Sequence, residues 1–189
     1  MKNDQQEAYE RVLTSSLARV LDFLKFAETK NAALLTFASA SIVASISNLN
    51  NATLGGAWRT AFTFALPLFI LSALTALYSF LPKTLLNRFH KDPEQSKALL
   101  YFGDAASFAP AAYKQRVLER YLPPENESAT QNYLDDLAIQ IAVNSQITKR
   151  KLTIFNTGAL IVFSAILVVS VPGILGLCRF LSAAFGSNP

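Results

Sequence analysis

Apolar residues gather in three long segments of the chain, and this pattern predicts three membrane spans. The segments are residues 31–49, 60–81 and 152–171, and none of them contains a charged side chain. A helix rises ~1.5 Å per residue, so crossing a hydrocarbon core of ~30 Å takes about 20 residues. Each segment is close to that length. We therefore expect an all-α fold, an integral membrane helical bundle whose spans are joined by polar regions.

The residues before the first span predict an amphipathic helix that continues directly into it. Between residues 9 and 24 the apolar side chains recur in steps of three and four, as on one face of a helix. These side chains are Tyr9, Val12, Leu13, Leu17, Val20, Leu21 and Leu24. No Pro or Gly separates this stretch from the span. Residues 1–30 are therefore expected to be a cytosolic amphipathic helix.

A polar region at residues 82–151 separates the second and third spans. Within it, residues 110–121 predict a short helix, which Pro123 and Pro124 close. Together with the N-terminal helix and the lower part of the last long helix, this region is expected to form a helical cytosolic domain.

The last long helix is expected to start near residue 130 and to run into the third span. Ser128 or Thr130 is suited to cap it, because a hydroxyl accepts hydrogen bonds from the free N–H groups of the first turn. Its polar half carries an apolar stripe of Leu134, Leu137, Ile141 and Ile147. Pro172 and Gly173 are expected to end it, because proline lacks the backbone donor that continues a helix.

The distribution of Lys and Arg predicts which side of the membrane each region faces. Most of these residues lie in regions 1–30 and 82–151, whereas the 50–59 loop and the 172–189 tail hold a single Arg each. By the positive-inside rule, the first two regions face the cytoplasm and the last two lie outside. This layout places the N-terminus inside and the C-terminus outside. The net charge of +4 is too small to predict binding to nucleic acid.

Few residues offer the chemistry of an active site. The chain has one cysteine, Cys178, and one histidine, His90, which excludes a Cys-based metal site and a pair of histidine ligands within the chain. His90 is interpreted as a residue near the lipid head groups, and Asp135 and Asp136 as residues that solvate a helix. The glycines form no phosphate-binding loop. We therefore expect a protein without catalytic activity, bound metal or cofactor.

Small residues in the first span predict that helices approach one another closely. Ser41 and Ser45, and likewise Ala40 and Ala44, are spaced four residues apart, which favours close backbone contact in lipid. They either pack against the other two spans or form an oligomer contact or a pore-facing surface. In the second span, Pro67 is expected to kink the helix.

Four polar residues stand where the N-terminal helix enters the first span: Glu28, Thr29, Lys30 and Asn31. Residues two apart on a helix do not face each other. Glu28 and Lys30 therefore cannot pair with each other, and an unpaired charge at the edge of a membrane is costly. We expect both side chains to find partners on other helices.

A second unusual stretch, residues 99–104, combines two aromatic side chains with a glycine and an aspartate, in the order LLYFGD. Such a turn in the cytosolic region has two interpretations. It is either an anchor for the hydrophobic core or the wall of a ligand pocket.

Three segments carry a resemblance to a known family. AETKNAALL at 27–35, LLYFGD at 99–104 and NSQITKRKL at 144–152 resemble the Pycsar transmembrane effector family of bacterial antiphage defence. The similarity covers nearly the whole chain. It implies an inner-membrane protein that binds a cyclic pyrimidine nucleotide, cCMP or cUMP, made by a partner pyrimidine cyclase on infection. The ligand-bound protein would then disrupt the inner membrane and stop the infected cell, a process called abortive infection.

The implied ligand narrows the choice of site residues. A cyclic nucleotide has one phosphate charge and a base, so its pocket needs Arg or Lys beside an aromatic face. Arg116 is our first choice for the phosphate and Tyr101 for stacking on the base. The full set of candidates is Lys30, Tyr101, Asp104, Tyr113, Arg116, Lys149 and Arg150. We expect the protein to act as a homo-oligomer in the lipid bilayer.

Two other functions remain open on the residues alone. The first is a membrane scaffold or assembly factor whose cytosolic helices bind a protein partner. The second is a membrane-bound enzyme that acts on lipid or nucleotide.

Overall fold

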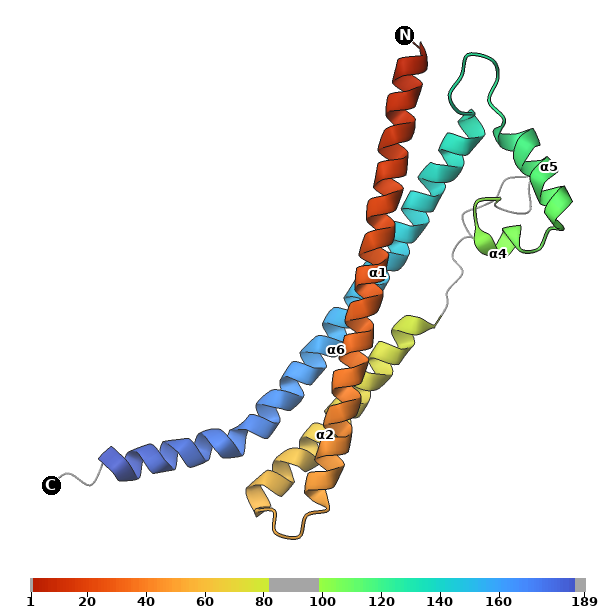
Figure 1. The fold of residues 1–189 in the computed structure, drawn as a ribbon. Helices are drawn as coiled ribbons and strands as arrows, with labels where there is room; N and C mark the ends of the chain where they lie inside the picture. The colour runs from red at the N-terminus through yellow and green to blue at the C-terminus, as the bar shows by residue number, and fades with distance from the viewer. Residues whose placement is uncertain (1, 82–98, 186–189) are drawn as a thin grey trace. The chain divides into compact units, whose positions relative to one another are not determined.

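A computed structural model describes residues 2–81 and 99–185, and Figure 1 traces these residues in chain order. His90 and the first part of the 82–151 region lie outside the described residues. The described chain is helical, and no strand occurs within it. Its helices are α1 (Lys2–Leu49), α2 (Gly56–Phe80), α4 (Phe102–Ala105), α5 (Pro110–Tyr121) and α6 (Gln131–Phe185). The expected all-α fold is confirmed.

The chain forms two compact units, and each is described by itself. The polar unit comprises Met1–Phe26 and Pro82–Lys149, and the apolar unit comprises Ala27–Leu81 and Arg150–Pro189. Two helices, α1 and α6, contribute residues to both units. The N-terminal amphipathic helix and the first span are therefore one continuous helix, as the sequence predicted.

The apolar unit is a bundle of segments from α1, α2 and α6. All three helices are long and apolar enough to cross a membrane. Their shared core consists mainly of small and branched side chains, which are Leu34 and Ala38 from α1, Ala65, Phe69, Ala73 and Ala76 from α2, and Val162 and Ala165 from α6. Small residues at helix contacts are typical of bundles in lipid, where close backbone packing replaces the hydrophobic effect.

Gly158 of α6 lies where all three segments of this bundle meet. A Cβ atom at this position would lie 2.6 Å from Leu34 Cδ2 of α1 and 3.5 Å from Ser72 Oγ of α2. The Ser72 hydroxyl donates a hydrogen bond of 3.0 Å to the Gly158 carbonyl, which needs the two backbones to be close. Any larger residue here would displace the end of the Leu34 side chain, so glycine allows the closest packing of the three segments.

The small residues of the first span divide between two faces of α1. Ser45 is buried and its hydroxyl donates to the Ser41 carbonyl at 2.7 Å, so this pair packs within the chain. Ala40 and Ala44 are exposed. Packing within the chain is therefore confirmed for Ser45, whereas an oligomer contact or pore-facing surface at Ala40 and Ala44 stays a prediction.

Two helix ends differ from the sequence prediction. α2 begins at Gly56, so the connection after α1 is shorter than the expected 50–59 loop. α6 does not end at Pro172 and Gly173 but continues to Phe185. A single proline removes one backbone hydrogen bond and bends a helix, but it does not prevent the residues beyond it from being helical. In Figure 1 the dark blue end of α6 changes direction.

The core of the polar unit forms where α1 meets α6. Leu13 of α1 packs with Ala129, Leu134 and Leu137, and Leu17 and Ile141 lie against this cluster. The buried stripe on α1 is narrower than the sequence predicted, since Tyr9 and Val12 remain exposed. Amphipathic periodicity places residues on a face but does not fix how much of that face its partner covers.

The ends of α5 and α6 agree with the predicted turn chemistry. Pro110 occupies the first turn of α5, where its missing N–H costs no helical hydrogen bond. Thr130 caps α6, because its hydroxyl accepts a hydrogen bond of 3.2 Å from the Tyr133 N–H.

We predict that Gly158→Leu destabilises the apolar unit by about 1–3 kcal/mol, because the added side chain overpacks a closed contact. The matched control is Gly176→Leu on the same helix, where a Cβ would meet nothing within 4 Å. Thermal unfolding of the detergent-solubilised protein, followed by circular dichroism, compares the two. Equal melting temperatures for both variants would show that the space at Gly158 is not needed.

Candidate functional site

The polar residues at the start of the first span form contacts with α6 inside the apolar unit. The Lys151 ammonium donates to Glu28 Oε1 at 2.9 Å. The Lys151 side chain is 15% exposed and the Glu28 side chain is 47% exposed, so the pair lies only partly in water. The expectation that Glu28 finds a partner on another helix is confirmed.

Cations at this junction lie over aromatic rings. Lys30 Nζ is 5.0 Å from the centre of the Phe155 ring on α6. Arg150 of α6 lies 5.2 Å from the centre of the Tyr78 ring on α2. A ring face attracts a cation electrostatically and also offers it an apolar surface. Such contacts suit charges that stand between water and hydrocarbon.

The Asn31 side chain links α1 to the backbone of α6. It is completely buried, and its Nδ2 donates to the Ala27 carbonyl at 2.9 Å and to the Lys151 carbonyl at 3.1 Å. Its Oδ1 is buried without a hydrogen-bond partner among the described residues, and so is Nη2 of Arg150. A buried acceptor and a buried donor that are both unpaired are costly. We call Glu28, Lys30, Asn31, Arg150 and Lys151 the junction cluster.

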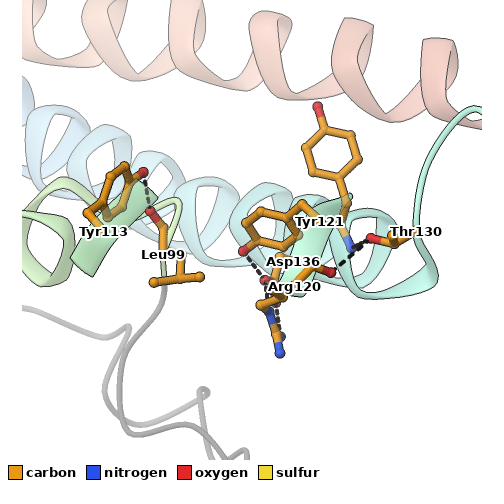
Figure 2. A network of polar contacts seen from close by, with 7 residues as sticks. Leu99, Tyr113, Arg120, Tyr121, Thr130 and Asp136 are labelled. Carbon is orange, nitrogen blue, oxygen red and sulfur yellow. Dashed lines mark hydrogen bonds and ion pairs between the residues drawn. The ribbon is translucent and has the colours of Figure 1, made fainter. Parts of the chain in front are cut away.

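The polar unit holds a second cluster, centred on Asp136 (Figure 2). Arg120 of α5 forms a bidentate ion pair with Asp136 of α6, with Nε–Oδ2 and Nη2–Oδ1 distances of 3.0 Å. The Tyr121 hydroxyl donates to Asp136 Oδ2 at 2.5 Å. The side chains of Arg120 and Asp136 are 12% and 5% exposed. We call these three residues the Asp136 cluster.

Burial and hydrogen bonding shift the ionisation of this cluster. The hydrogen bond to Asp136 raises the pKa of Arg120 above its ordinary value. Burial raises the pKa of the Tyr121 phenol, and its hydrogen bond to Asp136 adds to the shift. Arg120 therefore stays charged and Tyr121 stays neutral near pH 7. The pairing fixes the end of α5 against α6.

The Asp136 cluster corrects one interpretation from the sequence. Asp135 is exposed and accepts a hydrogen bond of 2.8 Å from Gln131, as expected for a residue that solvates a helix. Asp136 is buried instead. It lies off the apolar stripe of Leu134 and Leu137, so periodicity alone placed it in water. The packing of α5 on that side of α6 covers it.

The turn at 99–104 contributes to the core of the polar unit. Tyr101 packs against Val143, which is buried. A Cβ at Gly103 would lie 2.7 Å from Tyr101 Cε1, so glycine leaves room for the ring. Asp104 lies in α4 and is half-buried. The interpretation of this turn as a core anchor is confirmed, while its role in a ligand pocket stays a prediction.

Two more ligand candidates lie one turn apart on α5. The Tyr113 hydroxyl donates to the Leu99 carbonyl at 2.9 Å, which ties α5 to the 99–104 turn. Arg116 is exposed and pairs with Glu119 at 3.4 Å. Exposed pairs of this kind contribute about 0–1 kcal/mol. The Arg116 guanidinium is therefore weakly held and accessible from water.

The structure thus divides the sequence-predicted site residues between two places. Lys30 and Arg150 belong to the junction cluster, whose remaining polar neighbour Thr29 is exposed. Tyr101, Asp104, Tyr113 and Arg116 belong to the polar unit, as does the exposed Lys149. The described residues contain no group of three or more His, Cys, Asp or Glu side chains placed to hold a metal ion.

Sequence reasoning missed the rings that receive the junction cations and the partners of Asp136. Tyr78 and Phe155 lie near the ends of the second and third apolar segments. Aromatic residues are common at such positions in membrane proteins, so their place in the sequence could have indicated these contacts. Arg120 and Tyr121 gave no such signal.

Comparisons with known proteins give a consistent result. The Pycsar effector protein domain matches residues 12–177 of the chain. A curated relative, the Pycsar effector protein RsPycTM of a Rhizobium species, is 38% identical over 171 residues, which cover 89% of this chain and 96% of the relative. No solved structure matches the chain.

We predict that Asp136→Asn lowers the stability of the polar unit by about 3 kcal/mol, because it leaves the Arg120 charge buried without its counter-ion. Asp135→Asn is the matched control at the neighbouring, exposed position and should stay within about 0.5 kcal/mol of the wild type. Urea unfolding of the solubilised full-length protein measures both. Equal effects of the two substitutions would mean that the Arg120–Asp136 pair does not stabilise the unit.

Proposed function

The chain belongs to the Pycsar effector protein family, and from that premise we propose that it senses a cyclic pyrimidine nucleotide and then disrupts the inner membrane. As a member of this family it is an effector of bacterial antiphage defence. The proposed signal is cCMP or cUMP, supplied by a partner pyrimidine cyclase. The protein binds this ligand without converting it, and membrane damage causes abortive infection.

We place the nucleotide in the polar unit, on the face of α5 that carries Tyr113 and Arg116. These residues are three apart, so their side chains lie on the same side of the helix. Arg116 is accessible from water and its pair with Glu119 is weak, so a phosphate can displace the carboxylate. Tyr101 and Tyr113 offer aromatic faces for the base, and Asp104 offers an acceptor. The charge and stacking chemistry together support a cyclic nucleotide.

The observation that carries the proposal is that α1 and α6 belong to both units. A ligand-induced shift of either helix in the polar unit has a continuous helical path to the junction cluster. There, Asn31 Oδ1 and Arg150 Nη2 are buried without a hydrogen-bond partner among the described residues, so a movement of either helix that gives them partners would be favourable.

The energies required are modest. A ligand shifts an equilibrium only by its difference in affinity for the two states. A ~100-fold preference corresponds to roughly 2.7 kcal/mol. One charge-assisted phosphate contact and one stacked base each contribute ~1–3 kcal/mol. The proposed contacts are therefore sufficient.

We also propose the membrane arrangement that the charge distribution indicates. The protein lies in the inner membrane with residues 1–30 and 82–151 in the cytoplasm, and the connection near Gly55 and the 172–189 region outside. The spans are 31–49, 60–81 and 152–171.

We predict that reporter fusions will give cytoplasmic signals near Gln131 and an external signal near Gly55. The physical reason is that Lys and Arg near the spans are retained on the cytoplasmic side. Paired reporters that are active only in the cytoplasm or only outside measure the two positions. An external signal from Gln131 would overturn the arrangement.

We predict that cCMP or cUMP causes purified protein in liposomes to release a trapped dye. Protein-free liposomes and cyclic purine nucleotides are the controls, and chromatography shows whether the nucleotide is consumed. Light scattering on the detergent-solubilised protein, with and without the nucleotide, measures whether the expected homo-oligomer forms. Leakage that requires a second protein would favour a scaffold, and consumption of the nucleotide would favour an enzyme.

The same leakage assay tests whether the junction cluster contributes more to the response than another cation of α1 does. Lys30→Ala should raise the nucleotide concentration needed for leakage about tenfold, because it removes a cation held against Phe155 at the membrane edge. Lys25→Ala is the matched control, since Lys25 pairs with Asp22 and both side chains are largely exposed. Wild-type leakage by both variants would remove the junction cluster from the mechanism.

A further inference from the structure

The apolar part of α6 is longer than a membrane is thick. Residues 152–185 are helical, and at ~1.5 Å per residue they extend about 50 Å. A hydrocarbon core is ~30 Å thick, and spans tilt by no more than about 40°. The hydrocarbon core can therefore hold only part of this segment as a straight span. The end of α6 must lie outside that core.

Trp58 marks where that end begins. A Cβ at Gly173 would lie 3.6 Å from Trp58 Cη2, so the indole of α2 packs beside α6 directly after Pro172. Trp58 stands in the first turn of α2 and is 39% exposed. Tryptophan in this position is typical of the boundary between lipid and water. Residues 174–185 therefore start at that boundary.

The segment beyond Gly173 is amphipathic. Its apolar face repeats in steps of three and four, through Ile174, Leu177, Cys178, Leu181 and Phe185. Arg179 and Gly176 lie on the opposite side. All residues from 173 to 185 are exposed within the chain, including the large side chains of the apolar face.

We propose that residues 173–185 form an interfacial helix that lies along the leaflet at the Trp58 end of the bundle. Its apolar face contacts the boundary of the acyl chains, and Arg179 points to the phosphate head groups. The surface is continuous with the lipid-facing surface of the spans, and the bend at Pro172 lets the segment leave the direction of the third span. Lipid is the partner that fits both the apolar stripe and the single cation.

Two large apolar residues, Leu175 and Phe180, lie off this stripe, and both are exposed. Leu175 lines an apolar groove of about 360 Å³ between α2 and α6, together with Ala57, Phe64 and Pro172. Leu175 therefore faces the groove beside α2, although about half of its surface stays exposed.

The native chain carries the probe needed to test this proposal. Cys178 is the sole cysteine, is exposed and lies on the apolar face. It is labelled with an environment-sensitive fluorophore in full-length protein, which is then reconstituted into vesicles of phosphatidylcholine and phosphatidylglycerol. Lipids with a nitroxide near the head group should quench this label, and aqueous iodide should quench it several-fold less than it quenches the free dye.

The matched control is a label on the opposite face. Arg179→Cys in a Cys178→Ser background should show the reverse order, with strong quenching by iodide. Ala183→Cys in the same background is a second variant on that side, used if the first fails to fold by circular dichroism. The arm with native Cys178 needs no substitution.

Three results would overturn the proposal. Equal access of iodide to both faces would show a helix that projects into water. Protection of both faces from iodide, with lipid quenching, would show a helix within the hydrocarbon. Protection of position 178 from both lipid nitroxide and iodide would show that protein, such as a second copy of the chain, covers the apolar face.

Discussion

Charged and polar side chains at the edge of the apolar unit contact partners on other helices, and the alignment of α1 with α6 depends on these contacts. Two long helices, α1 and α6, carry such groups to the end of a hydrocarbon-facing bundle. The Glu28–Lys151 ion pair and the Asn31 hydrogen bond to the Lys151 carbonyl fix the register of these helices. With that register, Gly158 is set opposite Leu34 and Ser72, where a larger residue would displace the end of the Leu34 side chain. Polar pairing and close packing thus require the same alignment.

The polar unit also buries a charged side chain, Asp136, and there the charge is paired. Asp136 is held by two side chains from the end of α5, Arg120 and Tyr121, so the short helix is attached through charge as well as through apolar contact. The junction cluster, in contrast, leaves one acceptor and one donor unpaired. A fully paired buried cluster holds its helices rigidly, whereas unpaired buried polar atoms make the arrangement that contains them less stable. In our proposal the nucleotide binds in the polar unit and the junction cluster responds to it.

Much of the fold followed from local rules. The three long apolar helices, the bounds of α5 and the Thr130 cap need only residue periodicity, proline placement and side-chain capping, which act over a few neighbours. The end of α6 did not follow, because the effect of Pro172 depends on whether the residues beyond it gain from remaining helical. In the candidate site, the need of Glu28 and Lys30 for partners on other helices was predictable. The identity of those partners was not.

The sequence by itself determined the fold class, the three apolar helices and the polar motif where α1 enters the apolar unit, because these depend on composition and on spacing along one helix. The tertiary structure alone decided that Asp136 is buried beside Arg120 and Tyr121, while its neighbour Asp135 stays in water. It also decided which rings receive Lys30 and Arg150. These outcomes depend on which helix covers which face. That packing is set by contacts between residues far apart in the chain.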